Sequence, residues 1–341
     1  MPDTPSRLSP ETIEHIKRIE KIFSPLAHEG REQKRIRDNP GKEDYGNSFG
    51  RFSHYTTAEA GLKIISSRRL WMRSSLCMAD YREVEHGHDL LVQAFSKKRD
   101  TFFATADAVH PGIAKEAFGL FDGWWEQIRL NTYVTSVSDH RGGLEDSLGR
   151  LSMWRAFGGT SPRVALVFRV PWYTPAALAL GVIFSPVAYL GHEGAEAVLD
   201  LVMKNITDDA DFLKALTPEE FKASIFQMLI SAVFCAKHEG FLEESEWRGV
   251  YCPAFKGATL VEQSSAIVSG VPQKIFEIPF DGTKYVELAE LDLAQILDRV
   301  IVGPTSYPWV MYEAFVEALT AAGIPDGGNK VIVSNIPIRG P

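Results

Sequence analysis

The chain has 341 residues, of which 45% are hydrophobic and 23% are charged, as in ordinary globular proteins. Its formal net charge of −8 excludes a strong overall attraction to nucleic acid or anionic membranes, although a local basic groove stays compatible with it. The three cysteines suggest no disulfide framework, and no apolar run is long enough to span a membrane. We therefore expect a cytoplasmic protein without a signal peptide or membrane span.

The N-terminal region is expected to differ from the rest of the chain. A helix is predicted over 9–23, because a serine and a proline begin it and isoleucines form one stripe. The stretch 27–50 is charged and rich in Gly and Asn, which favours a loop or linker with its basic cluster on a solvated surface. Residues 1–48 are therefore predicted to be a helical extension and linker, ahead of a single domain over 49–341.

A strand is predicted over 51–57, followed by a helix that Thr56 or Thr57 caps and by a second strand over 70–75. His54 lies where the first strand gives way to the helix. A strand fixes such a side chain and the loop beyond exposes it, so this is a common place for a ligand-binding residue. A structural role for the histidine is the alternative interpretation.

Side chains that bind metal ions are concentrated in 79–89, namely Glu83, Glu85, His86, His88 and Asp89. Their spacing matches no strong metal motif. The sequence therefore favours the capped start of a helix with surface charge, and it predicts no metal site.

A helix over 113–128 precedes a strand over 132–138. Because alternate residues of a strand face the same side, Ser136 and Ser138 are expected to share a face. A short helix that contains Trp154 follows.

The segment 192–234 is strongly helical, and Thr217-Pro-Glu-Glu predicts a capping box with proline in the first turn. It separates a strand near 182–190 from the charged stretch 237–252. We therefore expect a helical insertion that packs beside the sheet and contains no strand in its last helix.

The stretch 237–252 places charges next to a predicted strand that includes Trp247. In an extended segment residues two apart face the same side, so Glu244, Glu246 and Arg248 are expected to share one face. Burying these charges without water is costly. That face is therefore expected either to line a polar cleft or to be a solvated strand edge with a salt bridge.

The tail contains predicted strands at 275–280, 299–302 and 330–334, with an amphipathic helix at 306–322. The predicted strands occur at irregular intervals along the sequence, with helices between some of them. The fold class is therefore predicted to be α+β.

Five blocks in order resemble a bacterial family known only as domain of unknown function 2971, over roughly 50–340. The blocks are Phe52-Ser-His54-Tyr55-Thr56, Asp80-x-x-Glu83 with His86-Gly87, Ser136-x-Ser138 followed by Met153-Trp154-x-x-Phe157-Gly158, Lys237-x-x-x-Phe241-x-x-Glu244-x-Glu246-Trp247-Arg248, and Ser334-x-Ile336-Pro337-x-Arg339. The family commonly has Asn before the aspartate of the second block, where this chain has Ala79.

The layout also resembles that of ADP-ribosyltransferases. They carry a His or Arg on a first strand, a helix after it, a Ser/Thr or Tyr element on a middle strand and a Glu, often in a Glu-x-Glu pair, on a late strand. The matching positions here are His54, Ser136-x-Ser138 and Glu244-x-Glu246. The segment His54-Tyr55-Thr56 is also similar to the His-Tyr-Thr sequence at the start of DNA-modifying ADP-ribosyltransferase toxins. This resemblance implies a split β-sheet core with helices and a helical insertion, and NAD as a substrate.

In that interpretation Glu246 stabilises the oxocarbenium ion that forms when NAD loses nicotinamide, and Glu244 orients or deprotonates the acceptor. Glu246→Gln is then expected to leave folding nearly intact while turnover falls. The predicted NAD-binding residues are His54, Tyr55, Thr56, Ser136, Ser138, Trp154 and Arg248. No GxGxxG motif follows a strand, so binding in the Rossmann manner is excluded.

Several alternatives stay open at this point. With water as the acceptor, the same site would make an NAD glycohydrolase. A nucleotide- or nucleic-acid-binding module without catalysis is a third possibility, and a metal hydrolase built on His86 and His88 is a fourth. For a transferase, which would act as a toxin or a phage defence factor, the acceptor is left open among protein, DNA, RNA and small molecules.

Overall fold

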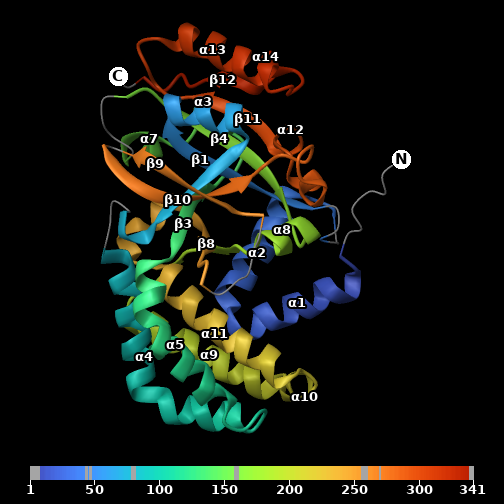
Figure 1. Ribbon diagram of the computed structural model, residues 1–341, viewed down its shortest axis with the longest axis vertical. Helices are drawn as coiled ribbons and strands as arrows, with labels where there is room; N and C mark the ends of the chain where they lie inside the picture. The colour runs from blue at the N-terminus through green and yellow to red at the C-terminus, as the bar shows by residue number, and fades with distance from the viewer. Residues whose placement is uncertain are drawn as a thin grey trace.

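The computed structural model describes residues 8–42, 45, 48–77, 82–156, 161–254, 260–268 and 270–337. A mixed sheet makes up one half of the molecule and a lobe of long helices the other (Figure 1). The predicted α+β class is confirmed. None of the helices in the described part of the chain combines the length and the apolar character needed to cross a membrane.

The main sheet has the strand order β12-β11-β4-β1-β3-β2-β10-β9, and β8 and β5 extend it from β3. Among the described strands of this sheet, neighbours are antiparallel except β11 and β12. The strands are β1 (Phe49–Thr57), β2 (Arg69–Ser74), β3 (Tyr133–Asp139), β4 (Arg163–Pro171), β5 (Ile183–Pro186), β6 (Ala188–Tyr189), β7 (Ala236–Lys237), β8 (Glu246–Tyr251), β9 (Glu262–Val268), β10 (Val271–Pro279), β11 (Leu297–Val302) and β12 (Val331–Val333).

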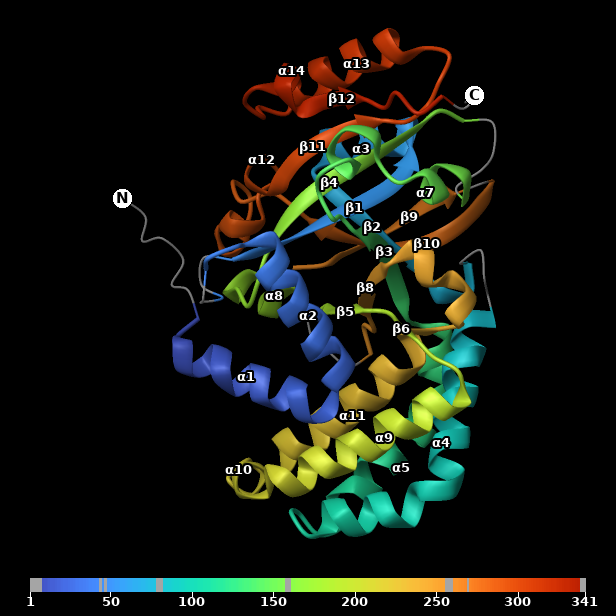
Figure 2. The same cartoon turned by 180° about the vertical axis from the view of Figure 1, so that it is seen from behind.

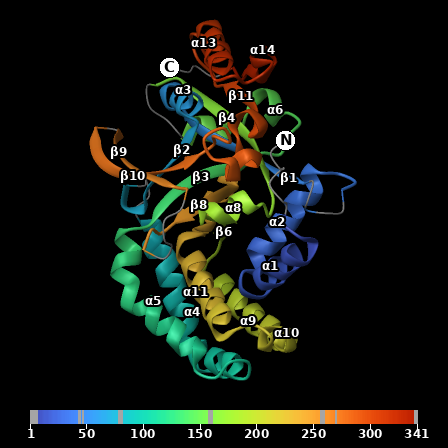
Figure 3. The ribbon, with the colours of Figure 1, turned by 45° about the vertical axis from the view of Figure 1, so that its right-hand side comes forward.

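The strand β3 lies at the branch point of the sheet. On one edge, β8 pairs with residues 133–138. On the other edge, β2 pairs with residues 133–134 and β1 pairs with residues 138–139. The strands β1 and β2 therefore diverge from one another along β3. Figure 3 shows the far end of the β2 branch, where β9 and β10 curve away from the other strands.

The helices divide between the faces of the sheet and the separate lobe (Figure 2). They are α1 (Pro10–Phe23), α2 (Pro25–Asp38), α3 (Ala58–Ser67), α4 (Arg82–Asp107), α5 (Ile113–Leu130), α6 (Glu145–Leu148), α7 (Leu151–Ala156), α8 (Pro175–Leu180), α9 (His192–Asp208), α10 (Ala210–Lys214), α11 (Pro218–Phe234), α12 (Leu293–Ile296), α13 (Pro308–Ala321) and α14 (Gly327–Lys330). The described residues also include the 3₁₀ turns η1 (Ser75–Cys77), η2 (Glu239–Glu244) and η3 (Val286–Leu291).

Local capping explains where several helices begin. The Ser9 hydroxyl accepts a hydrogen bond from the Thr12 amide at the start of α1, and the Thr57 hydroxyl accepts one from the Ala60 amide at the start of α3. At α11, Thr217 and Glu220 form the predicted capping box. These side chains satisfy amides that have no partner within the helix, which is why the sequence located these helix starts correctly.

The loop or linker predicted over 27–50 is wrong for most of its length, because α2 occupies Pro25–Asp38. Its basic side chains are not on a solvated surface as a group. Lys34 is 2% exposed and pairs with Asp38 at 2.9 Å and with Asp139 at the end of β3. The sequence did not reveal this burial, because Asp139 is distant along the chain and only the fold brings it to α2.

The predicted helical insertion 192–234 folds as α9, α10 and α11 and contains no strand, as expected. It packs chiefly against α4 and α5, which precede the insertion in the chain. The helices α4, α5, α9 and α11 share one hydrophobic core, with Phe102 and Phe221 fully buried in it. The insertion therefore completes a lobe that other parts of the chain begin.

Gly87 allows α4 to approach α11 closely, because a Cβ at this position would lie 2.1 Å from the carbonyl oxygen of Val233. We expect Gly87→Ala to lower the free energy of unfolding by about 1–3 kcal/mol, since the two backbones must move apart. Gly119→Ala on α5 is the control: nothing lies within 4 Å of its Cβ, and alanine is the better helix former. Urea unfolding compares the two variants, and an unchanged midpoint for Gly87→Ala would contradict the close approach.

Candidate functional site

The strands that carry the predicted site residues are neighbours, in the order β1-β3-β8. Across β3 and β8, Ser138 stands opposite Glu246, and Ser136 stands opposite Arg248. Directly opposed residues of antiparallel strands share a face. The two serines, Glu246 and Arg248 therefore lie on one face of the sheet, with Ser136 and Ser138 together as predicted.

Glu246 is 6% exposed and has two cationic partners. Arg248 donates to both carboxylate oxygens, from Nε at 2.8 Å and from Nη2 at 2.9 Å, and Lys237 donates from Nζ at 3.3 Å. Burial raises the pKa of the carboxyl, but Arg248, Lys237 and a hydrogen bond from Ser136 outweigh it and hold the pKa below its usual value. Glu246 is therefore ionised at neutral pH although it is buried.

Glu244 does not share the strand face of Glu246, so that prediction is wrong. Glu244 ends the 3₁₀ turn η2, and Ser245 has a φ of 44°, which breaks the extended geometry before β8 begins. Its carboxylate accepts a hydrogen bond from Lys237 at 2.7 Å. Both glutamates therefore meet at one lysine instead of on one strand face.

The face of β8 is neither a polar cleft nor a solvated edge, since all six residues of the strand are buried. The two-stranded ribbon β6–β7 covers it. The Tyr189 hydroxyl accepts a hydrogen bond from the amide of Glu246 at 2.8 Å, and the Val187 amide donates to the Glu246 carbonyl at 2.9 Å. Because β6 and β7 flank the helical insertion, the ends of the insertion close over Glu246.

His54 lies where β1 separates from β3. Its Nδ1–H donates to the Ser136 carbonyl at 3.0 Å, and burial lowers the pKa of the ring, which is therefore neutral at neutral pH. Alternation along β1 puts Ser53 on the face of Ser138 and His54 on the other. His54 and Glu246 are therefore joined through Ser136, by its carbonyl and its hydroxyl respectively, and the carboxylate face is not turned toward His54.

Tyr55, Trp154 and Thr56 complete the predicted binding set. The rings of Tyr55 and Trp154 pack edge to face with their centroids 4.8 Å apart, and both side chains are buried. The Tyr55 hydroxyl accepts a hydrogen bond from the Arg150 amide at 2.8 Å. Thr56 is half-buried on β1 opposite Val164. In this conformation the aromatic pair is part of the core and presents no free ring face.

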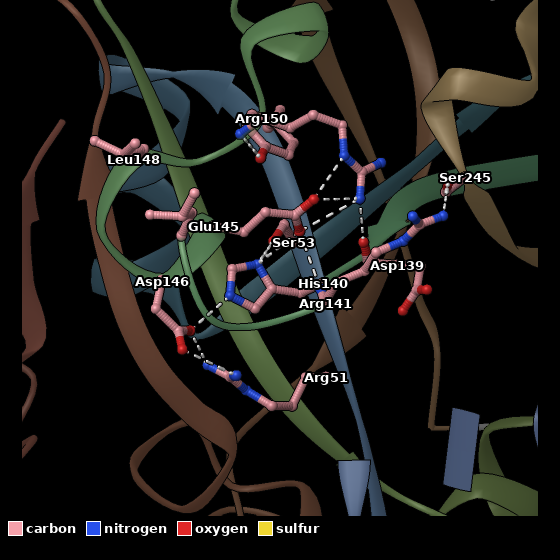
Figure 4. A network of polar contacts seen from close by, with 12 residues as sticks. Arg51, Ser53, Asp139, His140, Arg141, Glu145, Asp146, Leu148, Arg150 and Ser245 are labelled. Carbon is pink, nitrogen blue, oxygen red and sulfur yellow. Dashed lines mark hydrogen bonds and ion pairs between the residues drawn. The ribbon is translucent and has the colours of Figure 1, made fainter. Parts of the chain in front are cut away.

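A polar network beside Glu246 was not predicted from the sequence (Figure 4). The Ser53 hydroxyl donates to Nδ1 of His140 at 2.6 Å, and Nε2 of His140 donates to Asp146 at 2.9 Å. Arg150 joins this network to the candidate site, because it donates to the carbonyls of Asp139 at 2.5 Å and of Glu244 at 2.9 Å. The only signal in the sequence was a polar Ser-Asp-His run at the end of a predicted strand.

The Ser53–His140–Asp146 chain has the residue types of a serine hydrolase triad. Ser53 is 1% exposed and His140 is fully buried, so no substrate carbonyl can reach the hydroxyl. Burial lowers the pKa of His140, against a hydrogen bond to Asp146 that raises it. A neutral imidazole that is bonded at both nitrogens holds β1 to the loop before α6, and this is a structural role.

The pKa of Asp146 predicts that acid weakens the contribution of this network to stability. Burial raises its pKa, but hydrogen bonds from Arg51 and His140 outweigh that effect and lower the pKa to about 2. A lowered pKa stabilises the fold above the ordinary value of 3.8, and this contribution is lost as the pH falls toward 2. We expect Asp146→Asn to lower the thermal midpoint at pH 7, with the difference from wild type narrowing between pH 4 and pH 2. A difference that stays constant over this range would contradict the assignment.

The metal alternative gains no support, since no group of ligands suitable for a metal ion occurs among the residues that the structure describes. The His88 ring stacks on Trp125 with centroids 4.1 Å apart, and the His86 ring lies 6.0 Å from that of His238. Other positions of the family blocks lie outside the described residues, namely Ala79, Asp80, the Glu83 side chain, Phe157, Gly158 and Arg339.

Comparison of the sequence with protein-family models and with curated proteins finds no match, and comparison with solved structures finds none either. The resemblances to domain of unknown function 2971 and to ADP-ribosyltransferases therefore rest on the sequence blocks alone.

Proposed function

We propose that the protein is an NAD-consuming ADP-ribosyltransferase-like enzyme, related to domain of unknown function 2971, that modifies a macromolecule in the cytoplasm as a toxin or defence factor. The observation that supports this most is the adjacency of β1, β3 and β8. His54, the Ser136-x-Ser138 pair and Glu246 are far apart in the sequence, yet they occupy three neighbouring strands. The divergence of β1 and β2 along β3 is consistent with the split sheet of such a core.

The chemistry follows from the charge at Glu246. When the bond between nicotinamide and ribose breaks, its electron pair leaves with nicotinamide and the ribose becomes an oxocarbenium ion. The Glu246 carboxylate stabilises this cation, and Arg248 keeps the carboxylate ionised and oriented. The nucleophile of the acceptor then bonds to the ribose, and Glu244 takes the proton that the nucleophile loses.

Lys237 is the residue that NAD must displace from Glu246. Its Nζ lies 3.3 Å from Glu246 and 2.7 Å from Glu244, whereas Arg248 holds both Glu246 oxygens more closely. A cationic ribose brings a replacement charge to Glu246. Lys237 can then withdraw toward Glu244 without leaving a buried carboxylate unpaired, which would be strongly destabilising.

The test is release of nicotinamide from NAD by the purified protein, with and without cell lysate. Labelled NAD followed by separate protease and nuclease digestion identifies the class of acceptor. Transfer of label supports a transferase, and release that is unchanged by lysate supports an NAD glycohydrolase. Wild-type protein without any nicotinamide release would overturn the proposal.

Glu244→Gln is expected to reduce transfer to an acceptor by about 10²–10⁴-fold, the usual contribution of a general base. Hydrolysis of NAD should be affected less, because Glu246 and Arg248 are unchanged. The Glu244 side chain is 28% exposed, so we expect Glu244→Gln to lower the free energy of unfolding by no more than about 1 kcal/mol. The measurement is nicotinamide release with and without lysate, and equal losses in both would show that Glu244 does not act on the acceptor.

A nucleotide- or nucleic-acid-binding module without catalysis is the second candidate. The specific observation in its favour is that Glu246 is buried and fully paired with its own cations. Binding of NAD without nicotinamide release under any condition would favour this function over the first.

A further inference from the structure

A cavity of about 350 Å³ lies between the helical lobe and the N-terminal helices. Its walls come from the turn between α1 and α2, from α4, α9 and α11, and from the segment that joins β5 to β6. It is distinct from the candidate site at Glu246, because Ala188 and Ala236 of the ribbon line the cavity whereas Tyr189 and Lys237 contact Glu246.

The lining of this cavity is apolar. Leu26, Phe95, Val202 and Met228 contribute to it, and among the described residues none of the lining side chains is charged. The Cys235 thiol on its wall stays protonated, because burial raises its pKa to about 11. Groups able to hold a phosphate or a carboxylate by ion pairing are therefore absent from the described lining, and the chemistry favours an uncharged ligand.

We propose that this cavity binds a small uncharged molecule with a bicyclic aromatic ring or a short alkyl chain. An apolar protein cavity of about 150 Å³ accommodates benzene, and ligand pockets typically span about 300–1,000 Å³. The volume and the apolar lining of this cavity therefore match those of a small-molecule pocket.

The ribbon that covers Glu246 also forms part of the cavity wall, through Ala188 and Ala236, and Val187 lines the cavity just before β6. The Val187 amide donates to the Glu246 carbonyl at 2.9 Å. A ligand in the cavity thus contacts the same short segment that closes the candidate site. The binding proposal itself does not depend on the chemistry of NAD.

The first experiment titrates wild-type protein with N-phenyl-1-naphthylamine, an uncharged apolar dye, and follows its fluorescence. We expect saturable binding of one dye per chain, displacement by decan-1-ol and no displacement by NAD. A fluorescence increase that does not saturate would overturn the proposal. Displacement by NAD would do the same, because it would make the cavity a nucleotide site.

The second experiment fills the cavity from two facing helices. Ala195 and Ala232 line it from α9 and α11, and leucine is nearly as good a helix former as alanine. We expect Ala195→Leu/Ala232→Leu to weaken dye binding at least tenfold, with the two single variants in between. Ala197→Leu adds the same side chain at an exposed position of α9 and should bind as wild type does.

Thermal unfolding confirms that each variant is folded before its titration. Dye affinity that is unchanged in the folded double variant would overturn the proposal, as would an equal loss in Ala197→Leu. If the double variant does not fold, the single variants and the wild-type competition with decan-1-ol decide the question.

Discussion

Glu246→Gln is expected to lower NAD turnover by orders of magnitude and to lower the free energy of unfolding by about 3–5 kcal/mol. The turnover falls because the lost charge acts mainly on the cationic transition state. The stability falls because the amide group of glutamine cannot neutralise Arg248 and Lys237, which stay buried. The sequence alone predicted nearly intact folding, and the burial of β8 corrects that expectation.

Two further variants separate the catalytic effect from the effect on folding. Glu243→Gln changes an exposed carboxylate of the same stretch and should alter neither property. Glu246→Leu/Arg248→Met replaces the buried ion pair with apolar side chains, which often restores stability. That double variant should regain part of the lost stability and stay inactive.

The measurements are nicotinamide release at a temperature where circular dichroism shows a folded protein, and urea unfolding. If folded Glu246→Gln turns over NAD as fast as the wild type does, Glu246 does not carry the chemistry. An unchanged free energy of unfolding would mean that the pair with Arg248 contributes nothing to the fold.

Lys34→Met is expected to lower the free energy of unfolding by about 3–5 kcal/mol, because it leaves buried carboxylates without their closest cation. The side chains of Asp38 and Asp139 are 3% and 12% exposed. Arg37→Met is the matched control: Arg37 also pairs with Asp139, at 2.6 Å, but its side chain is 39% exposed. We expect that variant to lose less than about 1 kcal/mol.

Acid adds a second test of this cluster. Burial raises the pKa of Asp139, but Lys34 and Arg37 outweigh it and hold the pKa below its usual value. The stability that this carboxylate contributes is present above its ordinary pKa and is lost as the pH falls. The difference between wild type and Lys34→Met should therefore narrow below about pH 4 in urea unfolding. Equal free energies of unfolding of wild type and Lys34→Met at pH 7 would contradict the buried role of Lys34.

Local signals carried most of what the sequence predicted correctly. The caps at Ser9, Thr57 and Thr217 and the alternation around Ser136 and Ser138 depend on residues a few positions apart, and the structure confirms each of them. The strand β9 was not predicted, because its residues alternate between half-buried and exposed without a continuous apolar face.

Predictions that depended on distant partners failed. The left-handed conformation of Ser245 takes Glu244 off the strand, and nothing in the neighbouring residues demands it. The burial of Lys34 requires Asp139, and that of Glu246 requires Lys237 and the ribbon above it. A charged residue becomes a core residue only when the fold supplies its counterion. Local charge patterns therefore predicted solvent exposure for side chains that the structure buries in ion pairs.

The ribbon β6–β7 also bears on how separable the helical insertion is. Ala188 pairs with Ala236 and Tyr189 with Lys237 in a parallel ribbon, so the chain leaves the ribbon and re-enters it in the same direction. Parallel strands need a crossover connection of about a dozen residues or more, so a short turn cannot replace the insertion. The insertion also shares a core with α4 and α5, and those helices would lose the partner that covers their apolar faces. Connectivity and packing therefore both make the insertion inseparable from the rest of the fold.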